Sequence, residues 1–256
     1  MTRPIALITG ASRGIGRAIA LELAHHGFDV AANDVRGGAD LDAVAHEVHK
    51  IGRRAITLPF DVSDIDRHQS ALDQIAAELG TITSLVNNAG VGVLERGDPL
   101  DVSEASFDRC IAVNTKALFF LCQAAARHLM KAPADPDRPR TIINVTSSNA
   151  SAVSVPRSEY CASKAAAAMI SRCFAARLGP EGIAVYDVQP GLIETPMTAH
   201  VIETYKKRAA EGLCLFPWVG QPEDVARTVA SLATGRLPYT TGHVISVDGG
   251  MLVPRF

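Results

Sequence analysis

The chain lacks the features that mark membrane and nucleic-acid-binding proteins. Its 256 residues include one tryptophan, and they contain no extended basic run and no array of aromatic residues. The apolar fraction is 47%, the charged fraction is 20% and the net charge is −2, as in an ordinary soluble protein. The apolar stretch at residues 5–8 is too short for a signal peptide or a membrane-spanning helix. We therefore expect a cytoplasmic protein that binds neither nucleic acid nor membranes.

Disulfides and metal sites are not indicated either. Five cysteines are scattered along the chain without a C-x-x-C pair, so we expect reduced, packed thiols. Eight histidines are present, but none forms a metal-ligand set with a carboxylate or a thiol at the usual spacing. The sequence therefore predicts no metal site.

Short β-branched runs alternate with longer helical patterns along the chain. Strands are predicted at residues 5–9, 29–33, 54–60, 84–87, 141–146, 184–189 and 244–247, and helices at 14–26, 41–51, 65–79, 103–131, 160–178 and 222–233. This alternation is typical of βαβ units. We predict an α/β fold, a doubly wound (Rossmann) parallel sheet of about seven strands with helices on both faces. Nothing marks a boundary, so residues 1–256 are expected to form one domain, with the Pro-rich residues 132–139 as an exposed loop.

A glycine-rich turn follows the first predicted strand. Residues 9–16 read Thr-Gly-Ala-Ser-Arg-Gly-Ile-Gly, which is a G-x-x-x-G-x-G spacing. Glycines let the backbone approach a phosphate, and the N-terminus of the following helix offers free N–H donors. Such a turn can be merely a tight turn, but a strand before it and a helix after it favour a dinucleotide-binding site.

Asp34 bears on the choice of cofactor. It ends the second predicted strand, 24 residues after Gly10, where a carboxylate would accept hydrogen bonds from an adenosine ribose. Its charge would repel a 2′-phosphate, whereas Arg13 in the glycine turn would attract one, so charge alone does not decide. Because Asp34 would face the ribose itself, we favour NAD and keep NADP as the alternative. Asp34 capping a turn before Gly37 is the purely structural interpretation.

Tyr160 and Lys164 have the spacing that points two helical side chains the same way. A free tyrosine has a pKa of about 10, so a base that works near neutral pH needs its pKa lowered by roughly 2–3 units. One positive charge about 5 Å away, at an effective dielectric near 20, supplies roughly 3 kcal/mol, which is of the right size. On its own, however, a Tyr and a Lys four residues apart are usually only a helix-surface contact.

Several motifs occur together in a fixed order. They are Thr9–Gly16, Asp61-Val62, Asn87-Asn88-Ala89-Gly90, Asn114, Ser147, Tyr160-x-x-x-Lys164 and Pro190-Gly191-x-x-x-Thr195. In this order they resemble the signature of the short-chain dehydrogenase/reductase family, over residues 5 to about 250.

The resemblance implies a set of catalytic residues. Tyr160 would be the general acid in ketone reduction and the base in alcohol oxidation, and Lys164 would lower its pKa and bond the nicotinamide ribose. Ser147 would polarise the substrate oxygen, with its neighbour Ser148 as a rival. Asn114 would hold a water in the proton relay, or else it is a core amide satisfied by the backbone.

The resemblance also implies a set of cofactor-binding residues and a substrate segment. Besides Tyr160 and Lys164, the cofactor-binding residues would be Gly10, Ser12, Arg13, Gly14, Ile15, Gly16, Asp34, Asp61, Val62, Asn88, Ala89, Gly90, Pro190, Gly191, Ile193 and Thr195. Asn87 would mainly tie neighbouring strands together. Residues 196–217, with a helical stretch at 201–210 and apolar side chains including Leu213 and Trp218 nearby, are expected to close over the substrate. The cationic run 206–208 would either meet an anionic substrate or lie on a solvated helix face.

These observations together predict an NAD(P)-dependent oxidoreductase that interconverts a small secondary alcohol and a ketone. In general appearance the chain is similar to the branch of 3-oxoacyl-acyl-carrier-protein reductases, so a 3-oxoacyl thioester is one candidate substrate. An NAD-dependent sugar, polyol or hydroxy-acid dehydrogenase is the first alternative. A non-catalytic dinucleotide sensor is the alternative from another class, although it would not need Ser147, Tyr160 and Lys164 together. The resemblance and the apolar tail 251–256 also suggest a homotetramer.

Overall fold

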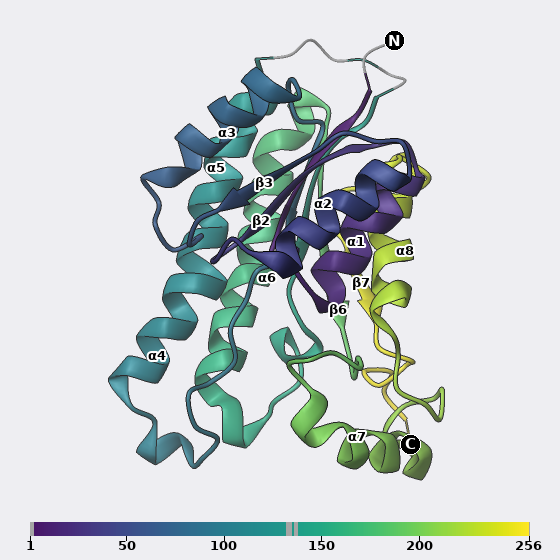
Figure 1. Cartoon of the computed structure of the whole chain (residues 1–256). Helices are drawn as coiled ribbons and strands as arrows, with labels where there is room; N and C mark the ends of the chain where they lie inside the picture. The colour runs from purple at the N-terminus through teal and green to yellow at the C-terminus, as the bar shows by residue number, and fades with distance from the viewer. Residues whose placement is uncertain (1–2, 132–134, 136–137, 256) are drawn as a thin grey trace.

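The fold is built on seven parallel strands in one sheet. The computed structural model describes residues 3–131, 135 and 138–255. The strands run in the order β3-β2-β1-β4-β5-β6-β7 (Figure 1). Their bounds are β1 (Ile5–Thr9), β2 (Asp29–Asp34), β3 (Ala55–Pro59), β4 (Ser84–Asn87), β5 (Arg140–Val145), β6 (Ile183–Pro190) and β7 (Val244–Val247). This confirms the doubly wound parallel sheet expected from the sequence.

Helices cover both faces of the sheet because each strand is apolar on both sides. Ala6 and Ile8 of β1 point into one core, whereas Ile5 and Leu7 point into the other. The first core is covered by α1 (Gly14–His25), α2 (Ala39–Lys50) and α8 (Pro222–Ala233). The second is covered by α3 (Arg67–Glu78), α5 (Leu118–Leu129) and α6 (Ser158–Leu178).

The strand order reverses beside β1, which pairs with β2 on one side and β4 on the other. After β2 the chain continues on one face of the sheet, and after β4 it continues on the other. A crevice therefore opens between them at the carboxyl ends of the strands. Helices α4 (Glu104–Ile111) and α7 (Ile202–Arg208) lie beyond these ends, at the bottom of Figure 1. The fold therefore places the predicted motifs, which follow strand ends, around one crevice.

The predicted helix at residues 103–131 needs correction, and the predicted loop at 132–139 lies mostly outside the described residues. The continuous helix predicted at 103–131 is divided into α4, a π-helical segment (Ala112–Ala117) and α5. Asn114 lies inside that π-helical segment, so an apolar periodicity alone did not reveal it. Most of the predicted loop 132–139 lies outside the described residues. In the part of the chain that the structure describes, no helix is both long and apolar enough to cross a membrane.

Candidate active site

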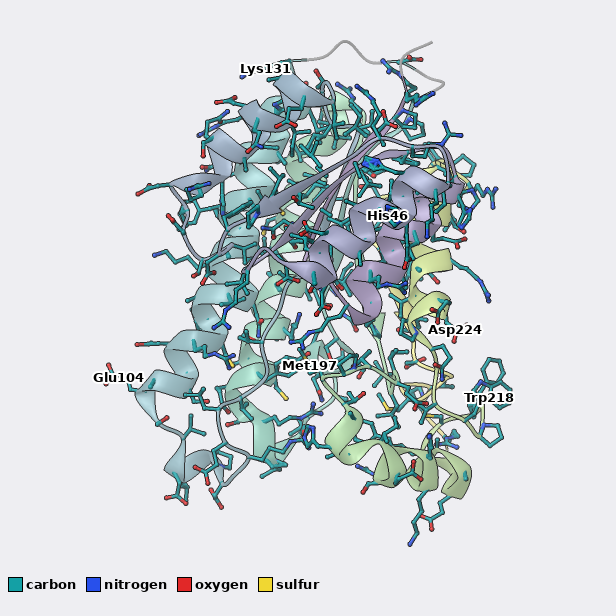
Figure 2. The ribbon with its side chains drawn as sticks, viewed as in Figure 1. His46, Glu104, Lys131, Met197, Trp218 and Asp224 are labelled. Atoms are coloured by element: carbon teal, nitrogen blue, oxygen red, sulfur yellow. The ribbon has the colours of Figure 1, made fainter. Side chains whose placement is uncertain are left out.

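A cavity of about 1480 Å³ opens at the carboxyl ends of the strands. It is lined by all of the predicted cofactor-binding and catalytic residues except Ser12 and Asn114. Met197, another lining residue, lies between the sheet and α7 (Figure 2). Motifs that are up to 185 residues apart in the chain, from Gly10 to Thr195, therefore meet in one space.

The glycine turn is packed too closely for side chains at its key positions. Gly10 has a positive φ of 64°, and a Cβ atom there would lie 3.0 Å from Cα of Ala89. A Cβ atom on Gly16 would lie 2.0 Å from the Gly10 carbonyl oxygen and 2.6 Å from Nδ2 of Asn88. Only glycine fits at position 16, because real Cβ contacts do not approach so closely.

The N-terminus of α1 faces the cavity without a side-chain cap. Arg13 precedes the helix and makes no capping hydrogen bond, and the first turn carries no acidic residue. Helix α4, in contrast, is capped by Ser103, which accepts from the backbone N–H of Ser106. The free N–H groups and the positive end of the α1 dipole suit a pyrophosphate, so the turn fits a dinucleotide.

Thr9 joins the glycine turn to the end of β4. Its buried Oγ1 accepts hydrogen bonds from the backbone N–H groups of Asn88 and Ala89, both at 3.0 Å. The Asn88 side chain returns two bonds, to the carbonyl oxygens of Thr9 at 3.0 Å and Gly10 at 3.1 Å. The two strand ends on either side of the crevice are thus held in one register. Asn87 ties β4 to β5 through a 2.8 Å bond to Asn144, as predicted.

Asp34 lies at the end of β2 on the cavity wall. One carboxylate oxygen accepts from Oγ of Ser12 at 2.5 Å and from the Ser12 backbone N–H at 3.2 Å. The other accepts from the backbone N–H of Val35 at 2.8 Å, as the turn-capping interpretation expects. Since Asp34 both caps this turn and lines the cavity, the two interpretations are compatible.

Tyr160 and Ser147 face each other across the cavity wall. Burial raises the pKa of Tyr160, whereas a hydrogen-bonding interaction with the Ser147 hydroxyl and the charge of Arg157 lower it. The Ser147 hydroxyl also accepts from the backbone N–H of Asn149 at 3.1 Å. Of the two adjacent serines, Ser147 is the one that acts on Tyr160.

Lys164 is buried one helical turn after Tyr160. Its Nζ lies 5.8 Å from the centroid of the Tyr160 ring and donates to the Val145 carbonyl oxygen at 3.2 Å. Burial lowers the pKa of Lys164 to about 8, although the charge of Asp187 acts in the opposite direction. Asp187 is buried on β6, where Gln189 donates to it at 2.8 Å. Burial raises the pKa of Asp187 in turn, and hydrogen bonds from Thr146 and Gln189 oppose that shift.

Asn114 is a buried amide whose side chain is hydrogen-bonded to the backbone, as its structural interpretation expects. Its Oδ1 accepts from the Val91 backbone N–H at 2.9 Å, and its Nδ2 donates to the Val91 carbonyl at 3.0 Å and to Oγ of Ser163 at 3.0 Å. The side chain is only 1% exposed. It therefore ties the loop after β4 to α6, directly behind Gly90 and Lys164.

Comparisons with known proteins agree with this geometry. A family model described as enoyl-(acyl carrier protein) reductase matches residues 10–252. The 3-oxoacyl-[acyl-carrier-protein] reductase FabG of Staphylococcus aureus (strain Mu50 / ATCC 700699) is 33% identical over 249 residues, covering 96% of this chain and 97% of the relative. The chain belongs to the short-chain dehydrogenase/reductase family. As a member of this family it is an NAD(P)-dependent oxidoreductase that interconverts a secondary alcohol and a ketone.

Solved structures of the family show the same fold and either cofactor. A Brucella melitensis 3-oxoacyl-[acyl-carrier protein] reductase in complex with NAD has a TM-score of 0.96 and 35% identity, with 100% of both chains covered. An Agrobacterium tumefaciens protein with bound NADP has a TM-score of 0.85 and 30% identity, covering 99% of this chain and 98% of the other. Because the same fold binds NAD in one of these structures and NADP in the other, the fold alone does not determine which dinucleotide is bound.

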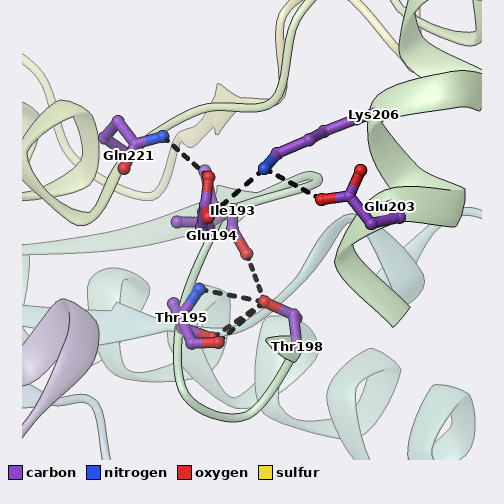
Figure 3. Close-up of polar contacts among 7 residues, drawn as sticks. All are labelled: Ile193, Glu194, Thr195, Thr198, Glu203, Lys206 and Gln221. Carbon is purple, nitrogen blue, oxygen red and sulfur yellow. Dashed lines mark hydrogen bonds and ion pairs between the residues drawn. The ribbon is translucent and has the colours of Figure 1, made fainter. Parts of the chain in front are cut away.

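The segment after β6 is braced by short polar contacts (Figure 3). Thr198 donates to the Ile193 carbonyl at 2.7 Å and accepts from the Thr195 backbone N–H at 2.9 Å. Glu194 forms an ion pair of 3.5 Å with Lys206 of α7 and accepts from Gln221 at 3.4 Å. These contacts connect the predicted substrate segment to the end of β6, where Thr195 lines the cavity.

The cationic and apolar residues of the substrate segment are divided between the cavity and the protein surface. Of the cationic run, Lys206 pairs with Glu194 and Glu203, and Lys207 pairs with Glu211, so only Arg208 lines the cavity. Among the apolar residues, Leu213 lines the cavity. Phe216 and Trp218 instead stack on each other at 4.9 Å with both rings more than half exposed, and Trp218 projects from the surface in Figure 2.

Sequence reasoning missed two charged residues of the site. Arg157 lies 5.6 Å from the Tyr160 ring centroid, and Asp187 acts on Lys164 from below. A charged residue inside the apolar run of residues 183–190 was a signal for Asp187. No comparable signal marked Arg157, because an arginine near the start of a helix is common on protein surfaces.

Proposed function

We propose that Tyr160 transfers the proton, that Ser147 and Lys164 support it in the roles expected from the sequence, and that Asn114 supports it by holding the surrounding backbone. The observation that carries this proposal is the convergence of the Ser147 hydroxyl and the Lys164 ammonium on Tyr160 inside the cavity. A catalytically silent sensor would need the glycine turn but not this group. In this assignment Tyr160 takes the hydroxyl proton during alcohol oxidation and returns it to the carbonyl oxygen during reduction.

The remaining roles follow from position. Ser147 donates a hydrogen bond to the reacting oxygen, where negative charge develops as a ketone is reduced. Lys164 keeps a positive charge beside Tyr160, and Asn114 fixes the loop and the helix on which the proton relay depends. A bound nicotinamide dinucleotide supplies the hydride acceptor or donor. The Asp187 carboxylate, which favours the charged form of Lys164, supports the same arrangement.

Replacing Tyr160 with phenylalanine tests the assignment. Because only the hydroxyl is lost, we expect kcat to fall by about 10³-fold or more while binding of the dinucleotide, followed by its fluorescence, stays within a factor of three. Tyr186→Phe is the matched control, since its hydroxyl bonds to the Thr240 carbonyl at 2.8 Å away from the cavity. Unchanged turnover in Tyr160→Phe would defeat the mechanism.

For the cofactor we propose NAD, because Asp34 lines the cavity at the end of β2. One negative charge about 5 Å from a doubly charged 2′-phosphate costs between about 2 kcal/mol in water and about 7 kcal/mol at an effective dielectric of 20. Asp34 is partly exposed, so the lower figure applies, and the Asp34 carboxylate by itself disfavours NADPH by roughly 30-fold. Asp34→Ala should remove most of this preference, and Asp40→Ala, on the exposed side of α2, should not. A clear NADPH preference that Asp34→Ala leaves unchanged would overturn the argument.

For the substrate we propose a 3-oxoacyl thioester, in keeping with the names of the relatives, or a small hydroxy acid, sugar or polyol, bound in the cavity that Tyr160 lines. We also propose one domain over residues 1–256, with residues 196–217 as the substrate segment. Turnover of purified protein against alcohols, sugars and 3-oxoacyl thioesters, with NAD and with NADP, discriminates among them. No turnover of any of these compounds would instead favour the sensor.

We further propose a cytoplasmic homotetramer. Apolar side chains remain exposed on the outer helices, including Phe107 on α4 at 45% and Met169 on α6 at 54%. Phe119 of α5 is 36% exposed and packs against Phe174 of α6 at 5.3 Å. Such apolar patches favour a symmetric interface between copies. Val253 in the predicted apolar tail is half exposed, and Phe256 lies outside the described residues. A monomer seen by light scattering at micromolar concentration would contradict this proposal.

A further inference from the structure

Arg157 is a fixed cation beside the proposed catalytic tyrosine. It precedes α6, and its guanidinium carbon lies 5.6 Å from the centroid of the Tyr160 ring. Its Nη2 donates to Oδ1 of Asn149 at 2.8 Å, and its Nε donates to Oγ of Ser154 at 3.3 Å. Asn149 in turn bonds to Ser147, so one short network holds the guanidinium and the catalytic serine together.

Within the described part of the chain, this guanidinium has no carboxylate partner. Its two hydrogen-bond acceptors are neutral, and among the described residues it forms no ion pair and Nη1 makes no hydrogen bond. The nearest acid in sequence, Glu159, is buried and accepts instead from Oγ of Ser106 at 2.6 Å and of Ser158 at 3.5 Å. A half-buried charge without a counterion is unfavourable, so an anion supplied by a ligand would be stabilising here.

The acidic residues that line the cavity lie at one of its ends. Asp34, which ends β2, and Asp61, which follows β3, lie at the end assigned to the adenosine, together with Arg13 of the glycine turn. Beyond Tyr160 the charged or titratable lining residues include no carboxylic acid; they are Arg96, Arg109, Arg157, His200, Tyr205 and Arg208, and none of the four arginines forms an ion pair within the described chain. A cavity lined by one sign of charge attracts ligands of the opposite sign.

We propose that the substrate is a 2- or 3-hydroxy acid, or the matching oxo acid, and that Arg157 binds its carboxylate. A planar guanidinium binds a carboxylate with two parallel N–H donors, one from each of two nitrogens. Nη1 of Arg157 makes no other hydrogen bond within the described residues, and Nη2 uses only one of its two N–H groups, on Asn149. Because Arg157 lies beside the ring whose hydroxyl meets the reacting oxygen, the carboxylate must be close to the reacting carbon. Arg208 of α7, which also lines the cavity, adds a second positive charge. This inference rests on the proposed function, and it selects among the substrates named there.

The experiment compares acids with their neutral esters. Oxidation of lactate and 3-hydroxybutanoate, both enantiomers of each, is measured with NAD alongside the methyl esters. We expect kcat/KM for the preferred acid to exceed that for its ester by about 10-fold to 100-fold, in line with a hydrogen bond to a charged group. Arg157→Gln should remove this difference by weakening the acid and sparing the ester, mainly through KM, and Arg157→Lys should restore part of it.

Two controls separate this role from a structural one. Arg177→Gln removes an exposed arginine of the same helix, paired with Glu181 at 3.1 Å, and should leave both substrates unaffected. An Arg157→Gln variant that loses acid and ester equally, or that shifts the pH profile of both by the same amount, would show that Arg157 acts only on Tyr160 or on folding. Either result overturns the inference, as does a wild type that turns over ester as well as acid.

Binding measurements distinguish failure of the inference from failure of the proposed function. Acid and ester are titrated into the protein with NADH, and the nucleotide fluorescence is followed. Binding of the acid that depends on Arg157, without turnover, would support the inference and defeat the proposed oxidoreductase assignment of Tyr160. Turnover of neutral alcohols combined with no binding of either acid in the millimolar range would leave the proposed function intact and overturn the inference.

Discussion

The substitution Gly16→Ala tests the packing of the glycine turn most directly. A methyl group at this position would meet the Gly10 carbonyl oxygen at 2.0 Å and Nδ2 of Asn88 at 2.6 Å. The oxygen belongs to backbone that also accepts from Asn88 at 3.1 Å, so it cannot move aside without breaking that bond. Overpacking commonly costs about 1–3 kcal/mol, and an immobile backbone neighbour places this case at about 3 kcal/mol or above.

The expected change in stability is large enough to measure by thermal unfolding. For a chain of this size 1 kcal/mol corresponds to about 2–4 °C, so Gly16→Ala should lower Tm by about 6–12 °C. Affinity for NADH should fall by about 10-fold or more, because the displaced Gly10 backbone forms the wall at the pyrophosphate position. Gly97→Ala is the control, since a Cβ atom there has no neighbour within 4 Å. A Gly16→Ala protein with Tm within 2 °C of wild type and unchanged NADH affinity would refute the packing argument.

Two further predictions concern buried polar groups. Thr9→Val leaves the N–H groups of Asn88 and Ala89 without their shared acceptor, and at about 1–3 kcal/mol for each buried group Tm should fall by at least 4 °C. Thr9→Ser keeps the acceptor and should lose less than half as much; equal losses would contradict the hydrogen-bond explanation. For Lys164 the folded-state pKa of about 8 lies below the unfolded value of about 10.4, so between these pH values the unfolded state binds more protons and stability rises with pH. The wild-type free energy of unfolding, measured in urea from pH 7 to 10, should therefore rise relative to that of Lys164→Met. If the free energies of the two proteins instead change with pH in the same way, burial does not lower the pKa of Lys164.

The sequence was sufficient for the sheet because strand and helix signals in this chain agree with the fold around them. The strand at residues 244–247 was predicted with the observed bounds, and the strand at 5–9 likewise. Both are short apolar runs between strong turn signals, where tertiary contacts reinforce the local preference. Asp34 was also placed correctly, since a strand's end fixes where its last side chain lies.

The π-helical segment at Asn114 was beyond this kind of reasoning. The periodicity of residues 103–131 is that of one long helix, and the interruption depends on a partner that is distant in sequence. Asn114 bonds to Val91 on the loop after β4 and to Ser163 on α6, and these bonds exist only once the sheet has brought the three segments together. The periodicity of one segment cannot predict a contact with residues that come near it only in the folded chain.

Arg157 shows the same limit for electrostatics. The spacing of four residues between Tyr160 and Lys164 predicts a contact, and hence that Lys164 lowers the pKa of Tyr160. In the folded protein Lys164 is itself buried and its own pKa is lowered, so its charge costs energy at that position. The positive charge of the Arg157 guanidinium lowers the pKa of Tyr160 and so opposes the effect of burial. In the proposed mechanism, proton transfer by Tyr160 therefore depends on two cations of different character. One is a buried lysine whose charge needs Asp187, and the other is an arginine whose free donors face the substrate end of the cavity.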